Sequence, residues 1–132
     1  MDSSSRHIYL TIAEVLEMQR QLIDEFGGIH GLRDRGLFEA AVFRPQNGYY
    51  DDLIHEAAAF MESLATNHAF LDGNKRISFA ATDTFLRING HYIEVEALAA
   101  HRFITDFLAK RESRIGPIRE WRKAHVRALG RE

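Results

Sequence analysis

Apolar side chains recur at helical spacing along most of this chain, and the first such stretch predicts a helix over residues 12–26. Its apolar positions fall on one face: Ile12, Val15, Leu22 and Phe26. Thr11 precedes the stretch and Glu14 follows three residues later, which is the capping-box pattern of a helix start. The pair Gly27-Gly28 then ends the helix.

The pattern predicts two further helices before residue 68. The shorter one covers residues 36–43 and is halted by Pro45, because proline disfavours helical geometry in the residue before it. Residues 44–52 follow as a loop or flap, with room for at most a small hairpin. From about Asp52 a third helix carries one apolar stripe: Ile54, Ala58, Met61 and Ala65. His68 continues that stripe.

Three more helices are predicted in the second half of the chain. The fourth begins near Asn74 and is apolar on several faces, which indicates a central, buried helix. A short extended link leads to a fifth helix over residues 96–109, and a sixth follows Pro117 with Leu129 facing inward. No strand-like alternation lasts long enough to build a sheet. The predicted fold is therefore all-α, a six-helix bundle with a short flap or hairpin before the third helix.

Length and composition indicate one domain. A chain of 132 residues that is 45% hydrophobic can bury a single core, which we assign to residues 8–132 after a disordered segment of residues 1–7. No stretch approaches the roughly 20 apolar residues of a membrane span, so no membrane partner is expected. The absence of cysteine agrees with a reducing compartment, and the expected location is cytoplasmic.

Charge is distributed unevenly along the chain. The net charge is −2, yet residues 110–132 carry eight Lys or Arg against three Glu, a surplus of +5 that leaves −7 for residues 1–109. A basic tail on an acidic body is typical of contact with a nucleic acid or an acidic partner, and equally of a solvated helix face.

Chemistry concentrates in one run of nine residues, His68-Ala69-Phe70-Leu71-Asp72-Gly73-Asn74-Lys75-Arg76. A helix that begins near Asn74 has unpaired N–H groups and a positive dipole end, and Gly73 lets a phosphate approach its backbone. Asp72 at the mouth of this anion site is a candidate ligand for Mg²⁺. His68 is the candidate general base.

Structural readings of the same residues stay open. A histidine on an apolar stripe is more often a core residue than a catalyst, and Asp72 has the position of a helix N-cap. Lys75 and Arg76 are compatible with a solvated first turn, although the helix dipole disfavours cations there and so favours a bound anion. Phe70 most simply fills the core and fixes the loop.

The run resembles the signature of the Fic/Doc (Fido) family, which is His, any residue, Phe, any residue, an acid, a small residue, Asn, Gly or Lys, and Arg. The stretch from Gly36 to Gln46 and the helix ending in Asn89-Gly90 resemble the death-on-curing branch, and most of residues 8–109 can be matched to it. The resemblance implies a six-helix Fido fold that transfers part of a nucleotide to a protein hydroxyl.

In that family the matching residues make His68 the base and Asp72 the Mg²⁺ ligand, with ATP as co-substrate. The resemblance places nucleotide phosphates on the following residues: Gly73, Asn74, Lys75 and Arg76. It also makes the flap a docking strand for the target, built from Gln46, Asn47, Gly48 and Tyr49.

Two positions bear on the transferred group. Relatives that transfer AMP usually have Gly at the position of Lys75 and a second Arg at the position of Phe79, and Doc-type kinases are similar to this chain in having the lysine. The resemblance therefore favours transfer of the γ-phosphate, with elongation factor Tu as the implied target. Gly73 matches the AMP-transfer form, so AMP transfer stays open.

Partners are also implied by the resemblance alone. The chain has no run matching the family's self-inhibitory helix, which implies restraint by another chain, a Phd-like antitoxin. Contact with nucleic acid would then be indirect, through the antitoxin. A non-catalytic corepressor on the same scaffold is the remaining alternative, and the complete motif argues against it.

Overall fold

A computed structural model describes residues 7–94, 102 and 126–129. Its helices are α1 (Ile12–Phe26), α2 (Arg35–Phe43), the 3-10 turn η2 (Arg44–Gln46), α3 (Leu53–Thr66) and α4 (Asn74–Ile88). Two short strands, β1 (His91–Ile93) and β2 (Val126–Ala128), pair antiparallel. Among the described residues, none of the helices combines the length and the apolar character that crossing a membrane needs.

Side chains cap the starts of α1, α2 and α3. The Thr11 side chain accepts from the backbone N–H of Glu14, and the Glu14 carboxylate accepts from the backbone N–H of Thr11, so the expected capping box is confirmed. Asp52 caps α3 by accepting from the backbone N–H of His55 at 2.8 Å. Asp34 caps α2 in the same way through Leu37.

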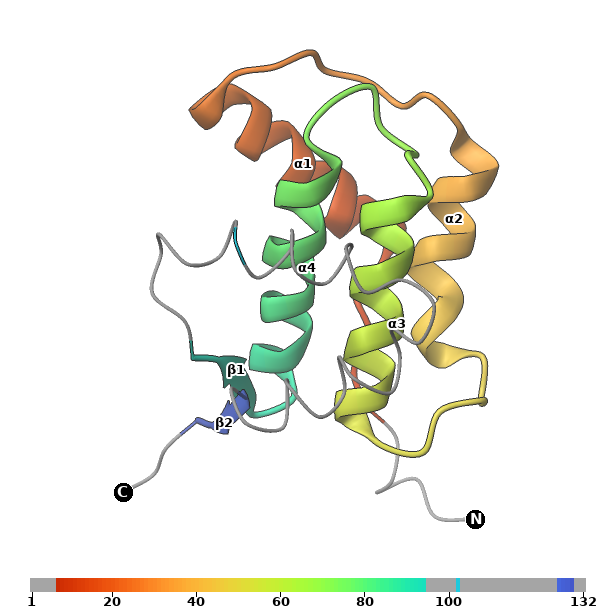
Figure 1. Cartoon of the computed structure of the whole chain (residues 1–132), viewed down its shortest axis with the longest axis vertical. Helices are drawn as coiled ribbons and strands as arrows, with labels where there is room; N and C mark the ends of the chain where they lie inside the picture. The colour runs from red at the N-terminus through yellow and green to blue at the C-terminus, as the bar shows by residue number, and fades with distance from the viewer. Residues whose placement is uncertain (1–6, 95–101, 103–125, 130–132) are drawn as a thin grey trace.

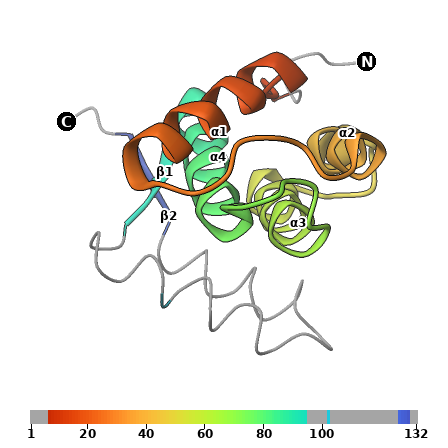
Figure 2. The ribbon, with the colours of Figure 1, turned by 90° about the horizontal axis from the view of Figure 1, so that it is seen from above.

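The central pair of helices is α3 and α4, with α1 and α2 packed alongside them (Figures 1 and 2). Phe60 of α3 meets Phe85 of α4 edge to face, with ring centroids 5.8 Å apart. Phe38 of α2 is fully buried against this core. The expected burial of α4 is confirmed, and α3 is even more enclosed, with buried residues on every face.

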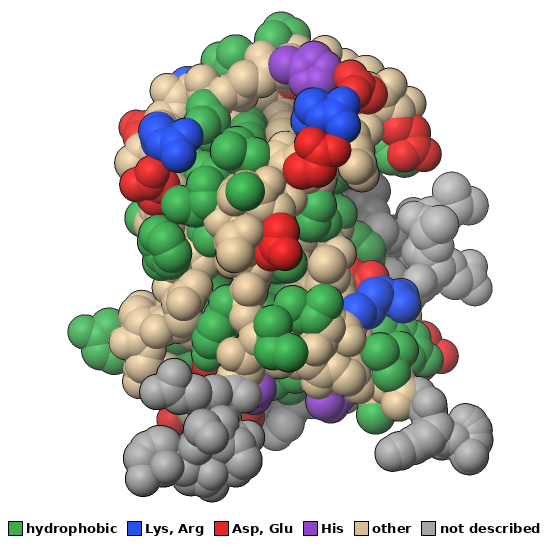
Figure 3. All heavy atoms as spheres, turned by 180° about the vertical axis from the view of Figure 1, so that it is seen from behind, with side chains coloured by type: hydrophobic (Ala, Val, Ile, Leu, Met, Phe, Trp, Pro, Cys, Tyr) green, Lys and Arg blue, Asp and Glu red, His purple; other side chains and the backbone are tan. Residues whose placement is uncertain are grey.

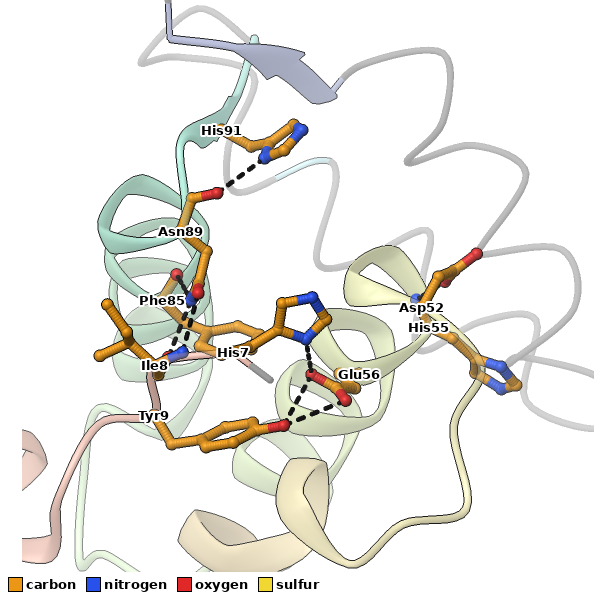
Figure 4. Close-up of polar contacts among 9 residues, drawn as sticks. All are labelled: His7, Ile8, Tyr9, Asp52, His55, Glu56, Phe85, Asn89 and His91. Carbon is orange, nitrogen blue, oxygen red and sulfur yellow. Dashed lines mark hydrogen bonds and ion pairs between the residues drawn. The ribbon is translucent and has the colours of Figure 1, made fainter. Parts of the chain in front are cut away.

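The segment before α1 lies across one end of the α3–α4 pair (Figure 4). The buried carboxylate of Glu56 accepts from the Tyr9 hydroxyl and lies 2.8 Å from Nδ1 of His7. Asn89 holds Ile8 by bonds to both its N–H and its carbonyl, each at 2.8 Å. His7, the last residue of the segment expected to be disordered, is therefore part of the packed structure.

Several expectations about the second half of the chain are corrected. The sequence predicted no sheet, yet β1 and β2 pair with His91 opposite Ala128. The predicted sixth helix cannot extend through residues 126–128, and Leu129 is exposed rather than inward. Three-residue strands are too short to show alternation, and their pairing depends on a contact across more than 30 residues.

The predicted fifth helix lies outside the described residues, apart from Arg102, which is helical. Before α3, residues 44–52 contain η2 and a loop, and no strand forms within them, so the suggested hairpin is absent there. As predicted, α2 ends before Pro45, at Phe43, but Arg44 keeps a helical backbone with φ −55° and begins the 3-10 turn that contains Pro45.

Candidate active site

The nine-residue motif forms the connection from α3 to α4 at the upper end of the molecule in Figure 1. Asn67 ends α3, and its N–H bonds to the Ser63 carbonyl. His68 then takes a left-handed backbone conformation with φ +54° and is exposed. The expectation that His68 continues the last turn of the helix is wrong, and so is the alternative that it is a core histidine.

Asp72 and Gly73 form the turn that enters α4. Gly73 occupies the N-cap position with φ +76°, and no side chain caps the helix, so the alternative reading of Asp72 as the N-cap is wrong. The Asp72 carboxylate instead accepts from the backbone N–H groups of Ile29, at 3.2 Å, and of Gly73, at 2.9 Å. The first turn of α4 thus faces outward with its N–H groups uncapped, an arrangement that suits an anion.

Hydrogen bonds between Asn74 and Phe70 hold the loop that connects α3 to α4. The Asn74 side chain accepts from the Phe70 N–H at 3.1 Å and donates to the Phe70 carbonyl at 3.0 Å. Phe70 is buried and packs edge to face on Phe38 with ring centroids 5.1 Å apart. The Asn74 side chain is therefore occupied by the loop, and this residue can offer an anion its backbone N–H.

Lys75 and Arg76 lie on the first turn of α4 with exposed side chains, and that turn contains no acidic residue. The Arg76 guanidinium lies over the ring of Phe26, the last residue of α1, with Cζ 4.8 Å from the ring centroid. Two cations at the positive end of a helix dipole are unfavourable unless an anion compensates them.

The loop between α1 and α2 lies beside the motif and is hydrogen-bonded to it (Figure 1). The sequence analysis did not predict this contact. Leu32 and Phe70 form an antiparallel bridge, and the Leu71 N–H donates to the Gly31 carbonyl at 3.0 Å. The Ala69 carbonyl accepts from two consecutive N–H groups of this loop. Arg33 adds a side-chain bond from Nε to the His68 carbonyl at 2.8 Å.

Gln19 of α1 is a second residue that sequence reasoning missed. Its side chain is only 4% exposed, and Nε2 donates to the Asp72 carbonyl at 2.7 Å. A Cβ added to Gly73 would make tight contacts of 3.3 Å with both Gln19 Nε2 and Ile23 Cδ1, in addition to the strain of its left-handed φ. The sequence signal that could have identified Gln19 is its position as a polar residue on the apolar face of α1.

The structure does not bring the predicted docking flap to the motif. Gln46 and Asn47 belong to η2 and its end, and Tyr49 projects from the loop with 81% of its surface exposed. The loop after η2 leads to the start of α3, whereas His68 follows the end of that helix, which is about 20 Å long. The segment that borders the motif is residues 27–34.

Charged side chains gather at this end of the molecule when it is seen from behind (Figure 3). On α1, Arg20 bonds to both Glu17 and Asp24, and Asp24 also pairs with His30 at 2.8 Å. The hydrogen bond from Arg20, with a second from Gln21, lowers the pKa of Glu17 to about 2. The same contact with Glu17 raises the pKa of Arg20. Arg20 is thus engaged by carboxylates, whereas the exposed Arg33, bonded to the His68 carbonyl, adds a cation beside those of the motif.

Asp72 could hold a metal ion at this site as its single carboxylate ligand. The described residues contain no group of three or more His, Cys, Asp or Glu side chains that could hold a metal ion. A single exposed carboxylate suits Mg²⁺, which usually keeps several waters and takes its other ligands from substrate phosphates. The donor set therefore fits a Mg²⁺ ion that arrives with a nucleotide.

Comparison with known proteins identifies relatives of this chain and its family. Toxin Doc of Mycolicibacterium smegmatis is 53% identical over 70 residues, which cover 49% of this chain and 54% of that protein. Protein kinase doc of Escherichia phage P1 is 34% identical over 89 residues, covering 64% and 69% respectively. The first match thus spans about half the length of that relative. Residues 9–86 match the Fic/DOC family, and this chain is a member of that family.

Proposed function

We propose that this chain is a Doc-like toxin that transfers a phosphate-linked group from ATP to a hydroxyl of a protein target. The observation that carries the proposal is the uncapped first turn of α4, entered through the left-handed Gly73 and flanked by exposed Asp72, Lys75 and Arg76. Both curated relatives bear the name Doc, one of them as a toxin and the other as a protein kinase.

Each motif residue has a chemical role in this proposal. His68, exposed at the start of the loop, takes the proton of the target hydroxyl, a role worth roughly 10²–10⁴ in rate. The hydroxyl oxygen bonds to the γ-phosphorus, the bond from that phosphorus to the bridging oxygen breaks, and ADP leaves. The backbone of Gly73 and Asn74 and the cations of Lys75 and Arg76 hold the phosphates.

Asp72 is the residue that would hold Mg²⁺. When bound, the ion supplies charge neutralisation on the phosphate oxygens. The bonds from the backbone of Ile29 and Gly73 fix the direction of the Asp72 carboxylate and leave acceptor capacity on both oxygens. The loop of residues 27–34 therefore orients the proposed metal ligand.

Transfer of the γ-phosphate is favoured over transfer of AMP by the first turns of α4. Lys75 stands where AMP-transferring relatives usually have a small residue. Phe79 stands where they usually have a second arginine, and its side chain packs against the hydrophobic core. Gly73 matches the AMP-transferring form and keeps that reaction as the second candidate.

The partners follow from the same proposal. The target is a protein hydroxyl, with elongation factor Tu the first to test, and a Phd-like antitoxin restrains the toxin. We propose that the target segment docks against residues 27–34 rather than 46–49, because only the former border the motif. Ile29 and Leu71 expose apolar side chains there, 63% and 51% of their surfaces respectively.

The test uses ATP labelled at the γ-phosphate or at the α-phosphate, with purified elongation factor Tu and Mg²⁺. Label transferred from the γ position supports the kinase, and label transferred only from the α position supports AMP transfer. No transfer to this or any other protein of a bacterial lysate would leave the corepressor reading. His68→Ala should abolish transfer, whereas His91→Ala, at the opposite end of α4, should retain it.

A further inference from the structure

The guanidinium of Arg76, a proposed phosphate ligand, lies in an electrostatically unfavourable place. Its guanidinium must stay beside the N-terminus of α4, where the helix dipole repels it in the absence of an anion. Asp72, the acid nearest to it in sequence, directs its carboxylate at the backbone N–H groups of Ile29 and Gly73. What lies against the guanidinium is an aromatic ring, that of Phe26 at 4.8 Å.

Burial contributes little stabilisation at Phe26, because more than half of its surface is exposed. Its side chain is 57% exposed at the last position of α1, and the next residue, Gly27, leaves the helix with φ +92°. The same stripe of α1 presents Gln19 to the Asp72 carbonyl and Ile23 to Gly73. The end of α1 therefore reaches the motif at three successive points, and Phe26 is the outermost of them.

An arginine can stack and bind phosphate at once. The face of the planar guanidinium lies on the ring, while its N–H donors point outward in the plane of the group. Such stacking restricts the long side chain before the ligand arrives, so less rotamer freedom is lost on binding. A cation–π contact at an exposed site contributes about 0.5–1 kcal/mol.

We propose that Phe26 is a positioning residue for the phosphate site: its ring holds the Arg76 guanidinium beside the first turn of α4. This inference rests on the proposed function, because it needs Arg76 to contact the phosphates. Phe26 acts through Arg76 and makes no contact of its own with the adenine base. Its effect should therefore appear with any ligand that carries the phosphates, with or without the nucleoside.

The experiment compares Phe26→Leu, which keeps apolar bulk without an aromatic face, with Phe26→Trp, which restores that face. Phe43→Leu is the matched control, since Phe43 is 50% exposed at the end of α2. The dissociation constants of ATP, inorganic tripolyphosphate and adenosine are measured for each full-length variant by calorimetry. Thermal unfolding of each variant verifies that the exposed substitutions leave the fold intact.

Phe26→Leu should weaken ATP and tripolyphosphate by the same factor, roughly two- to fivefold, the equivalent of one exposed cation–π contact. Adenosine binding should not change, Phe26→Trp should bind at least as tightly as the parent, and Phe43→Leu should match the parent. Unchanged tripolyphosphate binding in Phe26→Leu would overturn the proposal, and a loss with adenosine would mean that the ring contacts the base instead.

A second measurement separates this inference from the proposed function. In the parent protein without nucleotide, the NMR signal of the Arg76 Nε–H group should carry a ring-current shift that disappears in Phe26→Leu. Absence of that shift overturns the stacking whatever the protein binds. If the shift is present but the parent binds neither ATP nor tripolyphosphate, it is the proposed function that fails.

Discussion

The side-chain amide of Gln19 donates to the backbone carbonyl of Asp72 at 2.7 Å, a bond between residues 53 positions apart. It connects the middle of α1 to the turn that carries the proposed metal ligand. In the described part of the chain, Oε1 of the same amide is buried without a hydrogen-bond partner. Of the two polar atoms of this side chain, Nε2 is the one that reaches the motif.

Gln19→Met should therefore loosen the Asp72 turn more than it destabilises the fold. The substitution removes one good bond and one unsatisfied oxygen, so the free energy of unfolding should fall by only about 1 kcal/mol. Hydrogen exchange at the Gly73 and Asn74 amides should become faster, and group transfer should decrease. The matched substitution Gln21→Met, on the exposed face of the same helix, should alter neither. Unchanged exchange in Gln19→Met would show that the bond does not hold the turn.

The two glycines after α1 give a sharper test of the contact between the loop and Asp72. Both have positive φ, but an added Cβ at Gly28 would lie 2.8 Å from Asp72 Oδ2, whereas at Gly27 it would meet nothing within 4 Å. Both alanine substitutions force a positive φ that L-residues rarely adopt, at a cost of roughly 1–3 kcal/mol each. Only Gly28→Ala should also displace the carboxylate and weaken Mg²⁺-dependent ATP binding. Equal binding losses in the two variants, measured by calorimetry, would count against Asp72 as the metal ligand.

The site of target docking can be decided by two aspartate substitutions. Ile29→Asp places a charge on the exposed loop beside the motif, and Tyr49→Asp places one at the opposite end of α3. Ile29→Asp should raise the KM for the protein target several-fold, by a larger factor than it weakens ATP, which a carboxylate near the phosphate site also repels. Tyr49→Asp should leave both unchanged. The reverse pattern in steady-state kinetics would restore the flap at 46–49 as the docking segment.

Arg44 should carry more of the stability than other surface arginines. It pairs with the buried Glu62 at 2.7 Å, donates to Ser63 at 2.8 Å, and donates to the Tyr50 hydroxyl at 2.9 Å. Breaking a buried pair is costly, so Arg44→Met should lower the free energy of unfolding by about 3 kcal/mol. Arg35→Met, which breaks an exposed pair with Glu39, should change it by less than about 1 kcal/mol. Urea titrations of the two variants should differ accordingly.

The sequence predicted the helix ends and turns that are determined by residues close to them in the chain. The capping box of Thr11 and Glu14, the start of a helix near Asp52 and the breaks at Gly27 and Pro45 were all readable from neighbouring residues. The turn at Gly73 and the start of α4 at Asn74 followed from the same reasoning. In each case the chemistry lies within a few residues of the feature it specifies.

The remainder depends on contacts between distant segments. The sequence could not show that residues 27–34 lie on the motif, because the bridge between Leu32 and Phe70 depends on how α2 packs against α3. Nor could it show that the end of the predicted flap, at Asp52, lies a helix length from His68. His68 was placed on the helix because its spacing continues the apolar stripe, whereas the backbone turns to a positive φ first.

The sheet of β1 and β2 has a practical consequence. It follows the C-terminal end of α4, about 20 Å along that helix from Asn74 (Figure 1). Leu129 extends from β2 with an exposed side chain, and the chain has no cysteine. A single thiol introduced by Leu129→Cys would thus accept a fluorophore at one defined position. That position is far enough from the proposed phosphate site for a change in fluorescence to report partner binding without obstructing catalysis.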